Sequence, residues 1–419
     1  MKSVSKNLNS NISQQLFYLL VLVLFLRIDL VFENNTPTGG DMGAHIVAID
    51  TFIKDFMPNL QINGWSNDWF GGYPLYYFYF PLPAIITFIF NLVFPFGIAF
   101  KIMVVMSTIL VVYSIEKLMR KTSNQISIYG ATAGLFYVFT ESFTIYGGNL
   151  ASTLAGQFSF AYSLAFANLS IFYLIKSKNN FRFTISSIFL ALCLLSHLIP
   201  FIIYSPIYAF YWLSKKQNLN QRILSIFIFL ALASRWSVSL LMNLEYTTNM
   251  SYTPFSRLDD LIKKDILPII FILIGLLIAK HKNLIKNKTL NLFDLYISSS
   301  SILLYFYVPE GALWNGRLVP FFNLGIIFLF FKAVEIFIDD INLYQQGVNV
   351  LTGLFLGGTT YCLYIFYEKW SSNQSYLNLY IPIIFLIMIF AILNLNNVVV
   401  QLNLLIVSII FSTISFLPH

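Results

Sequence analysis

Asp41 and His45 are the side chains of this sequence best placed to carry out acid–base or phosphate chemistry. Both belong to the string TGGDMGAH, which follows a long apolar run at residues 16–32. The two glycines before Asp41 can end the apolar segment and turn the chain, and a short amphipathic helix is predicted over residues 42–57. Asp is also a favourable helix N-cap, so capping and function remain two interpretations of Asp41.

His45 follows Asp41 by four residues and therefore shares its face of the predicted helix. Such a pair can bind a divalent metal ion, contact a phosphate or form an internal hydrogen bond. Two ligands do not complete a metal site. The sequence therefore predicts no defined metal site and no certain cofactor. A divalent metal ion remains a possible cofactor.

An aromatic, glycine-rich stretch with the sequence NGWSNDWFGGYPLYY comes next. Aromatic side chains at a membrane interface are commonly anchors, but Trp and Tyr also pack on sugar faces while offering a polar edge. An acid between two Trp residues adds a hydrogen-bond acceptor. The candidate substrate-binding residues of this stretch are Trp65, Asp68, Trp69 and Tyr73.

Residues 141–157, ESFTIYGGNLASTLAGQ, are unusually polar and rich in small side chains. Small residues allow close approach of a ligand or of another helix, so binding and packing are both open. The candidate ligand-binding residues here are Asn149, Ser152 and Gln157.

Two arginines stand next to or inside apolar runs. Arg317, directly after Trp314, Asn315 and Gly316, could bind a lipid-linked phosphate through its guanidinium or simply extend to the membrane surface. Asn315 and Arg317 are both candidate substrate-binding residues. Arg235 lies within an apolar run, where a charge is a functional candidate by default, although a structural ion pair is an equal alternative.

The composition is that of an integral membrane protein. The 419 residues are 58% hydrophobic and only 10% charged, against about 25% charged in soluble domains. The formal net charge of +7 does not indicate nucleic-acid binding, because the basic residues form short clusters between apolar runs, where membrane topology places them.

The apolar runs predict an all-α, polytopic protein with about 13 transmembrane helices in a single domain over residues 1–419. Placing the basic clusters in the cytoplasm puts the N-terminus inside and residues 33–96 outside, in a loop with a juxtamembrane helix and a Pro-bounded re-entrant helix at residues 81–96. The spans are expected at residues 16–32, 98–118, 126–143, 158–175, 183–196, 198–213, 223–241, 266–279, 292–307, 318–338, 348–367, 380–395 and 399–416.

The longer loops of the predicted outer face hold most of the acidic, Gly, Asn, Ser and Thr residues, so the active face is expected to be extracytoplasmic. The sequence contains no P-loop, GxGxxG, nucleophile elbow or HExxH motif. A membrane enzyme without a nucleotide motif needs an activated substrate that reaches it through the lipid phase.

These features resemble the GT-C superfamily of membrane glycosyltransferases, which take a sugar from a polyprenyl-phosphate carrier at the outer face of the membrane. The strings GGDMGAH, GWSNDWFGGYPLYYFYFPLP, GGNLASTLAGQFSF, SHLIP and NGRLVPF look more specifically like a bacterial membrane-protein family labelled "6-pyruvoyl-tetrahydropterin synthase-related". They span about two-thirds of the chain. His197, in SHLIP, is interpreted as a turn residue.

The resemblance implies that Asp41 is the general base of an inverting sugar transfer. Arg317 is then the first candidate to neutralise the leaving lipid phosphate and Arg235 the second, while His45 orients Asp41 or contacts the phosphate. The implied partners are a polyprenyl-phosphate-linked sugar, a glycan, lipid or protein acceptor, and membrane lipids. The implied location is the inner (plasma) membrane.

Two other functions compete with a transferase. A transporter or flippase for a lipid-linked or anionic substrate would show polar or broken helices near the midplane, often in repeats. The chain shows no clear repeat and puts its polar residues mostly at the outer edge, although Arg235 favours the transporter. A scaffold in envelope assembly would need no enclosed acid.

Overall fold

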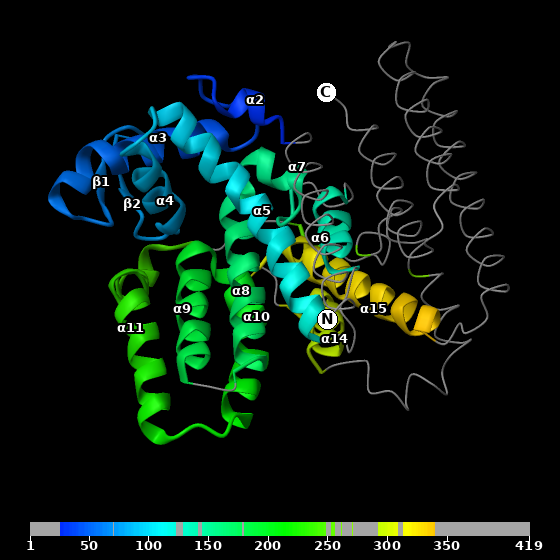
Figure 1. The fold of residues 1–419 in the computed structure, drawn as a ribbon. Coiled ribbons are helices and arrows are strands. Elements are labelled where there is room, and N and C mark those ends of the chain that lie inside the picture. Colours follow the sequence, from blue (N-terminus) through cyan, green and yellow to red (C-terminus); the bar gives the residue numbers. More distant parts are fainter. Residues whose placement is uncertain are drawn as a thin grey trace, which may run out of the picture.

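The computed structural model describes residues 26–69, 71–122, 129–140, 145–177, 180–248, 253–255, 261, 270, 292–308 and 313–339. Most of this part of the chain is helical (Figure 1). The α-helices are α2 (Ile28–Val31), α3 (Met42–Thr51), α4 (Leu82–Asn91), α5 (Phe96–Thr122), α6 (Tyr129–Phe139), α7 (Leu150–Ser152), α8 (Phe158–Ile175), α9 (Asn180–Ser196), α10 (Leu198–Ser214), α11 (Leu219–Met242), α14 (Leu292–Tyr307) and α15 (Val319–Asp339). Two strands, β1 (Gly64–Ser66) and β2 (Tyr73–Leu75), and five short π- or 3₁₀-helical segments, Phe52–Phe56, Met57–Asn59, Thr153–Gln157, Leu244–Tyr246 and Asn315–Leu318, complete the described elements.

Helix α8 is the centre of the helical bundle. Nearly all of its side chains are buried, and it packs against α5, α9 and α10. Its small residues, including Ala161, Ala165 and Ala167, are completely buried and let the neighbouring helices approach closely. The sequence of α8 is apolar on every side, because a helix enclosed by other helices has no face left for solvent.

A layer formed by α2, α3, α4 and the two strands lies over one end of this bundle (Figure 1). Helix α3 continues into the π-helical segment Phe52–Phe56, so the helix predicted at residues 42–57 is present, but the apolar side chains of α3 are not confined to one face. Ile49 and Phe56 of its predicted apolar face are buried.

The expectation of an all-α fold was wrong for this layer. Strands β1 and β2 form an antiparallel hairpin in which Trp65 faces Pro74. Its loop turns through Gly72, whose φ is +115°. An added Cβ at Gly72 would lie 2.4 Å from the indole nitrogen of Trp65, so glycine allows the loop to fold against the ring. The hairpin was not predicted from the sequence, because aromatic and turn residues are mixed in this stretch.

The helices expected at residues 158–175 and 292–307 coincide with α8 and α14, and the other expected spans between residues 98 and 338, apart from 266–279, overlap described helices. The Pro-bounded segment is the short helix α4. Among the described residues, three stretches are long and apolar enough to cross a membrane: Phe96–Met119, Leu150–Ile175 and Leu219–Met242. The expected count of 13 is not confirmed. The spans expected at 266–279, 348–367, 380–395 and 399–416, and most of 16–32, lie outside the described residues.

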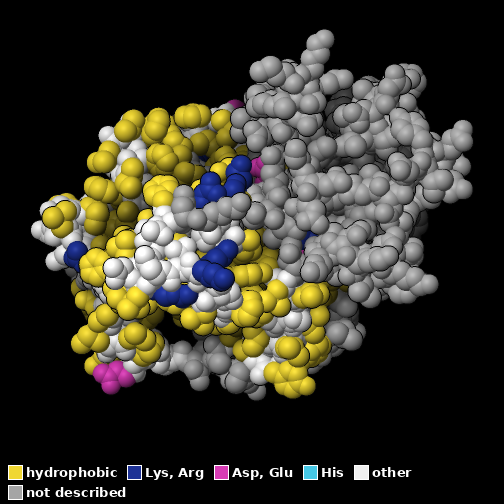
Figure 2. Space-filling model, turned by 60° about the horizontal axis from the view of Figure 1, so that its bottom comes forward, with side chains coloured by type: hydrophobic (Ala, Val, Ile, Leu, Met, Phe, Trp, Pro, Cys, Tyr) yellow, Lys and Arg dark blue, Asp and Glu magenta, His cyan; other side chains and the backbone are white. Residues whose placement is uncertain are grey.

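Basic side chains gather at the end of the bundle opposite α3. The turns that join α8 to α9 and α10 to α11 lie at this end (Figure 1), and Figure 2, which brings it forward, shows Lys and Arg among hydrophobic side chains. Arg222 donates to the carbonyls of Trp212, Leu213 and Lys215. The described basic residues Lys176, Arg182, Lys215 and Arg222 therefore lie at one end of the bundle.

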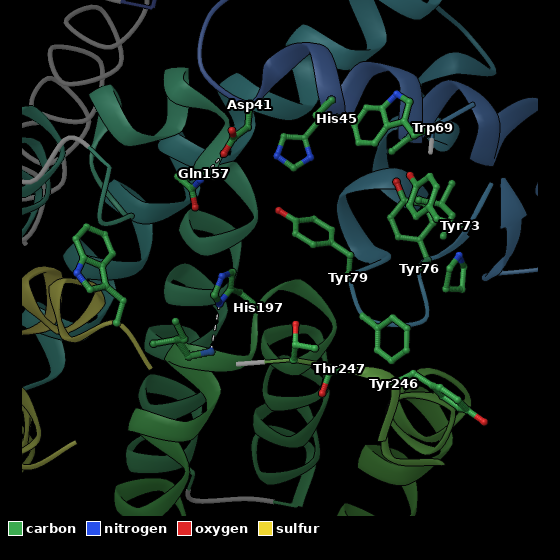
Figure 3. A pocket seen from close by; sticks show the side chains of 18 of the residues that line it. Asp41, His45, Trp69, Tyr73, Tyr76, Tyr79, Gln157, His197, Tyr246 and Thr247 are labelled. Atoms are coloured by element: carbon green, nitrogen blue, oxygen red, sulfur yellow. Dashed lines mark hydrogen bonds between the residues drawn. The ribbon is translucent and has the colours of Figure 1, made fainter. Parts of the chain in front are cut away.

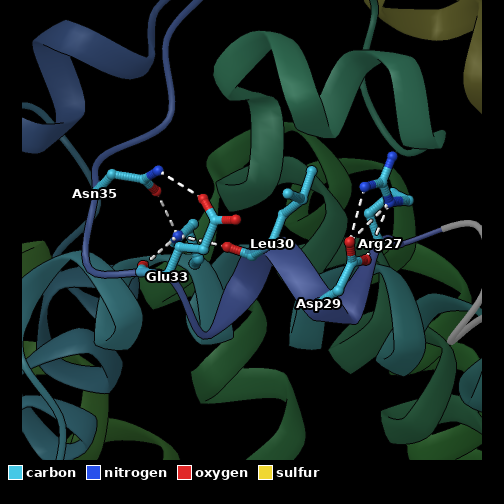
Figure 4. Close-up of polar contacts among 6 residues, drawn as sticks. Arg27, Asp29, Leu30, Glu33 and Asn35 are labelled. Carbon is cyan, nitrogen blue, oxygen red and sulfur yellow. Dashed lines mark hydrogen bonds and ion pairs between the residues drawn. The ribbon is translucent and has the colours of Figure 1, made fainter.

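Lys101 of α5 ties the segment before Asp41 to the bundle (Figure 4). Its buried ammonium donates to the carbonyls of Leu30 and Glu33 at 2.6 Å and to Oδ1 of Asn35 at 2.7 Å. Gly97, one turn earlier in α5, makes room for this approach, since an added Cβ would lie 2.5 Å from the carbonyl oxygen of Asn35. The position of the loop that leads to Asp41 therefore depends on α5.

We expect Lys101→Met to destabilise the protein by about 1–3 kcal/mol, because it leaves three acceptors without their donor. The matched control is Lys54→Met. Lys54 forms an exposed ion pair with Asp50, and such pairs contribute about 0–1 kcal/mol. Thermal unfolding in detergent measures both variants, and equal losses would contradict the anchoring role of Lys101.

Candidate functional site

A cavity of about 930 Å³ lies between the layer that contains α3 and the ends of the bundle helices. Its wall combines segments that are far apart in the sequence: α3, the hairpin and the residues after it, the turn before α8, the start of α10, the segment after α11 and the segment before α15. The lining residues are Asp41, Ala44, His45, Ala48, Trp69, Tyr73, Pro74, Leu75, Tyr76, Phe78, Tyr79, Gln157, His197, Ile199, Tyr246, Thr247, Thr248, Leu313, Trp314 and Arg317.

Asp41 occupies the N-cap position of α3, but its side chain makes no capping hydrogen bond. The carboxylate instead lies at the cavity wall and accepts a hydrogen bond from the amide nitrogen of Gln157, with Nε2 and Oδ2 3.1 Å apart (Figure 3). Capping by the side chain is therefore not the reason for an acid at this position.

Gln157 links Asp41 to Arg317. The amide oxygen of Gln157 accepts a hydrogen bond from Nη1 of Arg317 at 2.7 Å, while the amide nitrogen donates to Asp41. The same Nη1 also donates to the carbonyl of Tyr146 at 3.3 Å. Two hydrogen bonds and one amide group hold the carboxylate and the guanidinium on the order of 8 Å apart, so they do not form a direct ion pair.

The backbone on both sides of this link is in close contact. The amide of Asp41 donates to the carbonyl of Ala155 at 2.9 Å. Gly156, in the π-helical segment Thr153–Gln157, has a φ of +103°, and an added Cβ would lie 2.8 Å from Cβ of Asp41. At Gly40 an added Cβ would lie 2.3 Å from the carbonyl oxygen of Ala155. The two turns pack together only because both positions are glycine.

His45 lies beside this pair with one unsatisfied nitrogen. Its ring packs edge-on against Phe158 at a centroid distance of 4.8 Å and lies 5.5 Å from the ring of Tyr79. Its Nε2 is buried and has no hydrogen-bond partner among the described residues. Burial lowers the pKa of His45, against the opposing effects of Asp41 and a backbone hydrogen bond with Gly156. A neutral imidazole with a free nitrogen can bind a ligand hydroxyl.

His197 is the N-cap of α10, and its Nδ1 accepts a hydrogen bond from the amide of Ile199 at 3.2 Å. In the neutral ring the proton is therefore on Nε2, which makes this nitrogen a donor. Burial, assisted by Arg317, lowers the pKa of His197 to about 3. The interpretation of His197 as a turn residue is confirmed, but the side chain also lines the cavity (Figure 3).

Aromatic and hydroxyl side chains form the other end of the cavity (Figure 3). Trp69 and Tyr73 stack with their ring centroids 5.7 Å apart and their planes 15° apart. Tyr76 and Tyr79 line the wall next to them. Burial raises the pKa of Tyr79 to about 12, so its hydroxyl stays neutral.

The structure brings half of the candidate residues into the cavity: Asp41, His45, Trp69, Tyr73, Gln157 and Arg317. Three of the others form hydrogen bonds within the protein, outside the cavity wall. Trp65 is largely exposed and donates to Asn67, and the carboxylate of Asp68 accepts from the hydroxyls of Thr51 and Ser66. Asn315 is buried and bonded to the backbone of Phe255.

The remaining candidates also have structural partners outside the cavity wall. Asn149 caps α7 by accepting from the amide of Ser152, and the hydroxyl of Ser152 accepts from the amide of Gly147. Both side chains are buried. Arg235, on an exposed face of α11, donates to the carbonyl of Leu60 at 2.9 Å. It therefore supports the loop after α3 and does not line the cavity.

Several cavity residues were not among the candidates. Tyr76 and Tyr79 belong to an aromatic run that the sequence shares with ordinary membrane anchors. The string SHLIP drew attention to His197 as a turn residue. Its position near Arg317 depends on contacts between distant segments, which the sequence does not reveal. Among the described residues, no group of three His, Cys, Asp or Glu side chains lies close enough to bind a metal ion.

The fold and the cavity define a class, that of multi-pass helical membrane proteins with a polar cavity beneath a juxtamembrane layer. Within this class the chain has an ArnT-like fold. The structure of ArnT from Cupriavidus metallidurans in the apo state matches it with a TM-score of 0.57 and 10% identity, over 97% of this chain and 77% of that chain. The same protein bound to undecaprenyl phosphate matches with a TM-score of 0.55 and 13% identity, over 96% of this chain and 76% of that chain.

The chain matches no protein-family model and no curated protein sequence. The narrower family expected from the sequence strings therefore has no support in these comparisons, whereas the GT-C fold expected from them does. At such low identity the likeness establishes the fold and not the substrate.

His197 should make the protein less stable in acid. Its pKa is about 3 in the folded protein and about 6.5 in an unfolded chain, so between these values the unfolded state binds a proton that the folded state does not. Its contribution is complete above about pH 6.5 and is lost as the pH falls toward 3, at up to about 1.4 kcal/mol per pH unit.

His197→Asn keeps an N-capping side chain but does not titrate. We expect its thermal midpoint to fall less steeply than that of the wild type between pH 7 and pH 4. Thermal unfolding in detergent at several pH values measures this difference, and parallel curves for the two proteins would contradict the buried neutral imidazole.

Proposed function

We propose that this protein is a glycosyltransferase that moves a sugar from a polyprenyl-phosphate carrier to an envelope glycan, lipid or protein acceptor. The observation that carries the proposal is the pairing of Asp41 with Arg317 through Gln157 at one end of the cavity. The ArnT-like fold supports it, and ArnT itself has been seen with undecaprenyl phosphate bound. In this proposal the cavity faces the extracytoplasmic side of the inner membrane.

The separation of the two charges suits an inverting transfer. Asp41 accepts the proton of an acceptor hydroxyl while that oxygen forms a bond to the anomeric carbon of the donor sugar. The bond from this carbon to the phosphate oxygen breaks, and its electron pair leaves on the phosphate. The carboxylate and the guanidinium then lie on opposite sides of the reacting carbon, as an in-line inverting displacement requires.

Arg317 and His197 are suited to bind the leaving phosphate. A guanidinium forms charge-assisted hydrogen bonds with phosphate oxygens, and the Nε2–H of a neutral His197 adds a donor without adding charge. His45 presents its free Nε2 close to Asp41, where it can hold the acceptor hydroxyl in position. Donors that are already oriented need no rearrangement as charge develops on the phosphate.

The transporter alternative rested on Arg235. That side chain lies on the outside of α11 and bonds to Leu60, so it offers no binding site for a substrate within the described cavity. The charged residues of the cavity wall are gathered at one end and paired through Gln157, an arrangement more useful for a reaction than for passage of an ion. We therefore favour the enzyme.

The direct test uses purified protein and undecaprenyl phosphate carrying radiolabelled hexoses. We expect Asp41→Asn to reduce sugar transfer by about 10²–10⁴-fold while leaving the binding of undecaprenyl phosphate unchanged. Arg317→Met should weaken that binding by about tenfold or more, since a hydrogen bond to a charged group contributes about 1.5–3 kcal/mol.

Asp50→Asn is the matched control, because Asp50 lies on the same helix and bonds to Lys54 outside the cavity. It should transfer sugar at the wild-type rate. Undiminished transfer by Asp41→Asn would rule out the assignment of the general base.

The close contact between Gly156 and Asp41 gives a second prediction. Gly156→Ala should lower transfer by about 10²-fold, because a displacement of about 1 Å at a reacting group has an effect of this size. Gly39→Ala is matched in backbone strain, with a φ of +104° against +103°, but has open space around it. We expect both variants to lose some stability and Gly156→Ala alone to lose most transfer; equal losses of transfer would contradict the positional effect.

A further inference from the structure

The cavity has two ends with different chemistry. Of the described residues that line it, Asp41 and Arg317 carry formal charges at neutral pH, and Gln157 joins them at one end. Figure 3 shows Trp69 and Tyr73 at the opposite end and His45 and Tyr79 between the two. The far end is built from the aromatic side chains of Trp69, Tyr73 and Tyr76, while Tyr246 and Thr247 line the side of the cavity nearer the bundle helices.

The two ends are separated by the length of α3. Asp41 stands at the start of the helix and Ala48, which also lines the cavity, lies seven residues later, on the order of 10 Å along the axis. A ligand with one group at Asp41 can therefore extend beyond the reacting atoms to Trp69 and Tyr73. The donor sugar cannot do so, because its anomeric carbon and its phosphate both belong between Asp41 and Arg317.

The far end has the surface that a sugar ring needs. The stacked rings of Trp69 and Tyr73 are half-buried and form a flat apolar surface, on which the C–H faces of a pyranose can pack. The Tyr hydroxyls can both donate and accept, so they match the hydroxyl groups around such a ring. An acyl chain would leave these hydroxyls without partners, which is unfavourable.

The far end also lacks a partner for a charged sugar among its described lining residues. Asp68, which directly precedes the lining residue Trp69, already accepts from the hydroxyls of Thr51 and Ser66. Burial raises the pKa of both Tyr73 and Tyr76, so neither becomes an anion at neutral pH. An ammonium or carboxylate group on the ligand would lose its hydration without gaining a counter-charge.

We propose that this aromatic end is the acceptor subsite and that it takes an uncharged pyranose unit of a glycan. The inference rests on the proposed function, since it assigns the other end of the cavity to the lipid-linked donor. It adds the class of acceptor, a neutral glycan rather than an amino sugar, a uronic acid or an acyl chain.

The experiment measures binding, separately from transfer. Purified protein in a detergent without a sugar head group is titrated with methyl glucoside, methyl glucosaminide and methyl glucuronide, and saturation-transfer NMR reports the binding of each. We expect the neutral glycoside to bind and the cationic and anionic ones to bind at least about tenfold more weakly.

Tyr73→Ala should weaken the binding of methyl glucoside by about threefold to tenfold, the range for loss of one aromatic packing partner. Tyr307→Ala is the control, because Tyr307 is an exposed aromatic residue of α14 that does not line the cavity; it should bind like the wild type. If Tyr73→Ala does not fold, Tyr73→Leu keeps apolar bulk and removes the aromatic ring and the hydroxyl, with the same expected loss.

Asp41→Asn separates this inference from the proposed function. It should abolish sugar transfer and still bind methyl glucoside. Neutral binding that depends on Tyr73, without transfer from any lipid-linked donor, would keep the subsite and reject the transferase. Equal or tighter binding of a charged glycoside, or binding that Tyr73→Ala leaves unchanged, would overturn the subsite.

Discussion

The contact between the turn at Asp41 and the turn at Gly156 is the constraint on which the rest of the site depends. The amide of Asp41 bonds to Ala155, and the next residues, Gly156 and Gln157, bring the side-chain amide to the carboxylate. A side chain at Gly40 or Gly156 would force the two turns apart. The geometry of the acid therefore comes from backbone packing, which is stiffer than any single side-chain contact.

The fold holds this contact from both sides. Lys101 and Gly97 of α5 fix the loop that arrives at Asp41, and α8, which starts at Phe158, is the most enclosed helix of the bundle. Asp41 and its amide partner Gln157 are thus attached to two elements, α5 and α8, that pack directly against each other. A π-helical turn at the head of α8 gives the extra bend that points Gln157 toward Asp41, and such turns are frequent at functional sites.

Neutral histidines complete the chemistry of the polar end. Burial keeps His45 and His197 uncharged, so they can serve as hydrogen-bonding groups without competing with Arg317 for an anion. Among the described residues that line the cavity, Arg317 supplies the one guanidinium and Asp41 the one carboxylate, and Gln157 bonds to both. The site therefore keeps the Asp41 carboxylate and the Arg317 guanidinium apart, at the two ends of one hydrogen-bonded series through Gln157.

The sequence by itself determined the helical membrane class and most helix positions in the described part, and it proposed Asp41, His45, Gln157 and Arg317, which line one cavity. These followed from apolar length and from polar residues in an otherwise apolar chain, which are local signals. Tertiary structure alone decided which polar residues meet. Asn149 and Asn315 look like binding residues in sequence but bond to the backbone in the fold, whereas His197 enters the cavity only because α10 begins beside Arg317. A polar side chain can satisfy the backbone or face a ligand, and only the packing of distant segments distinguishes the two.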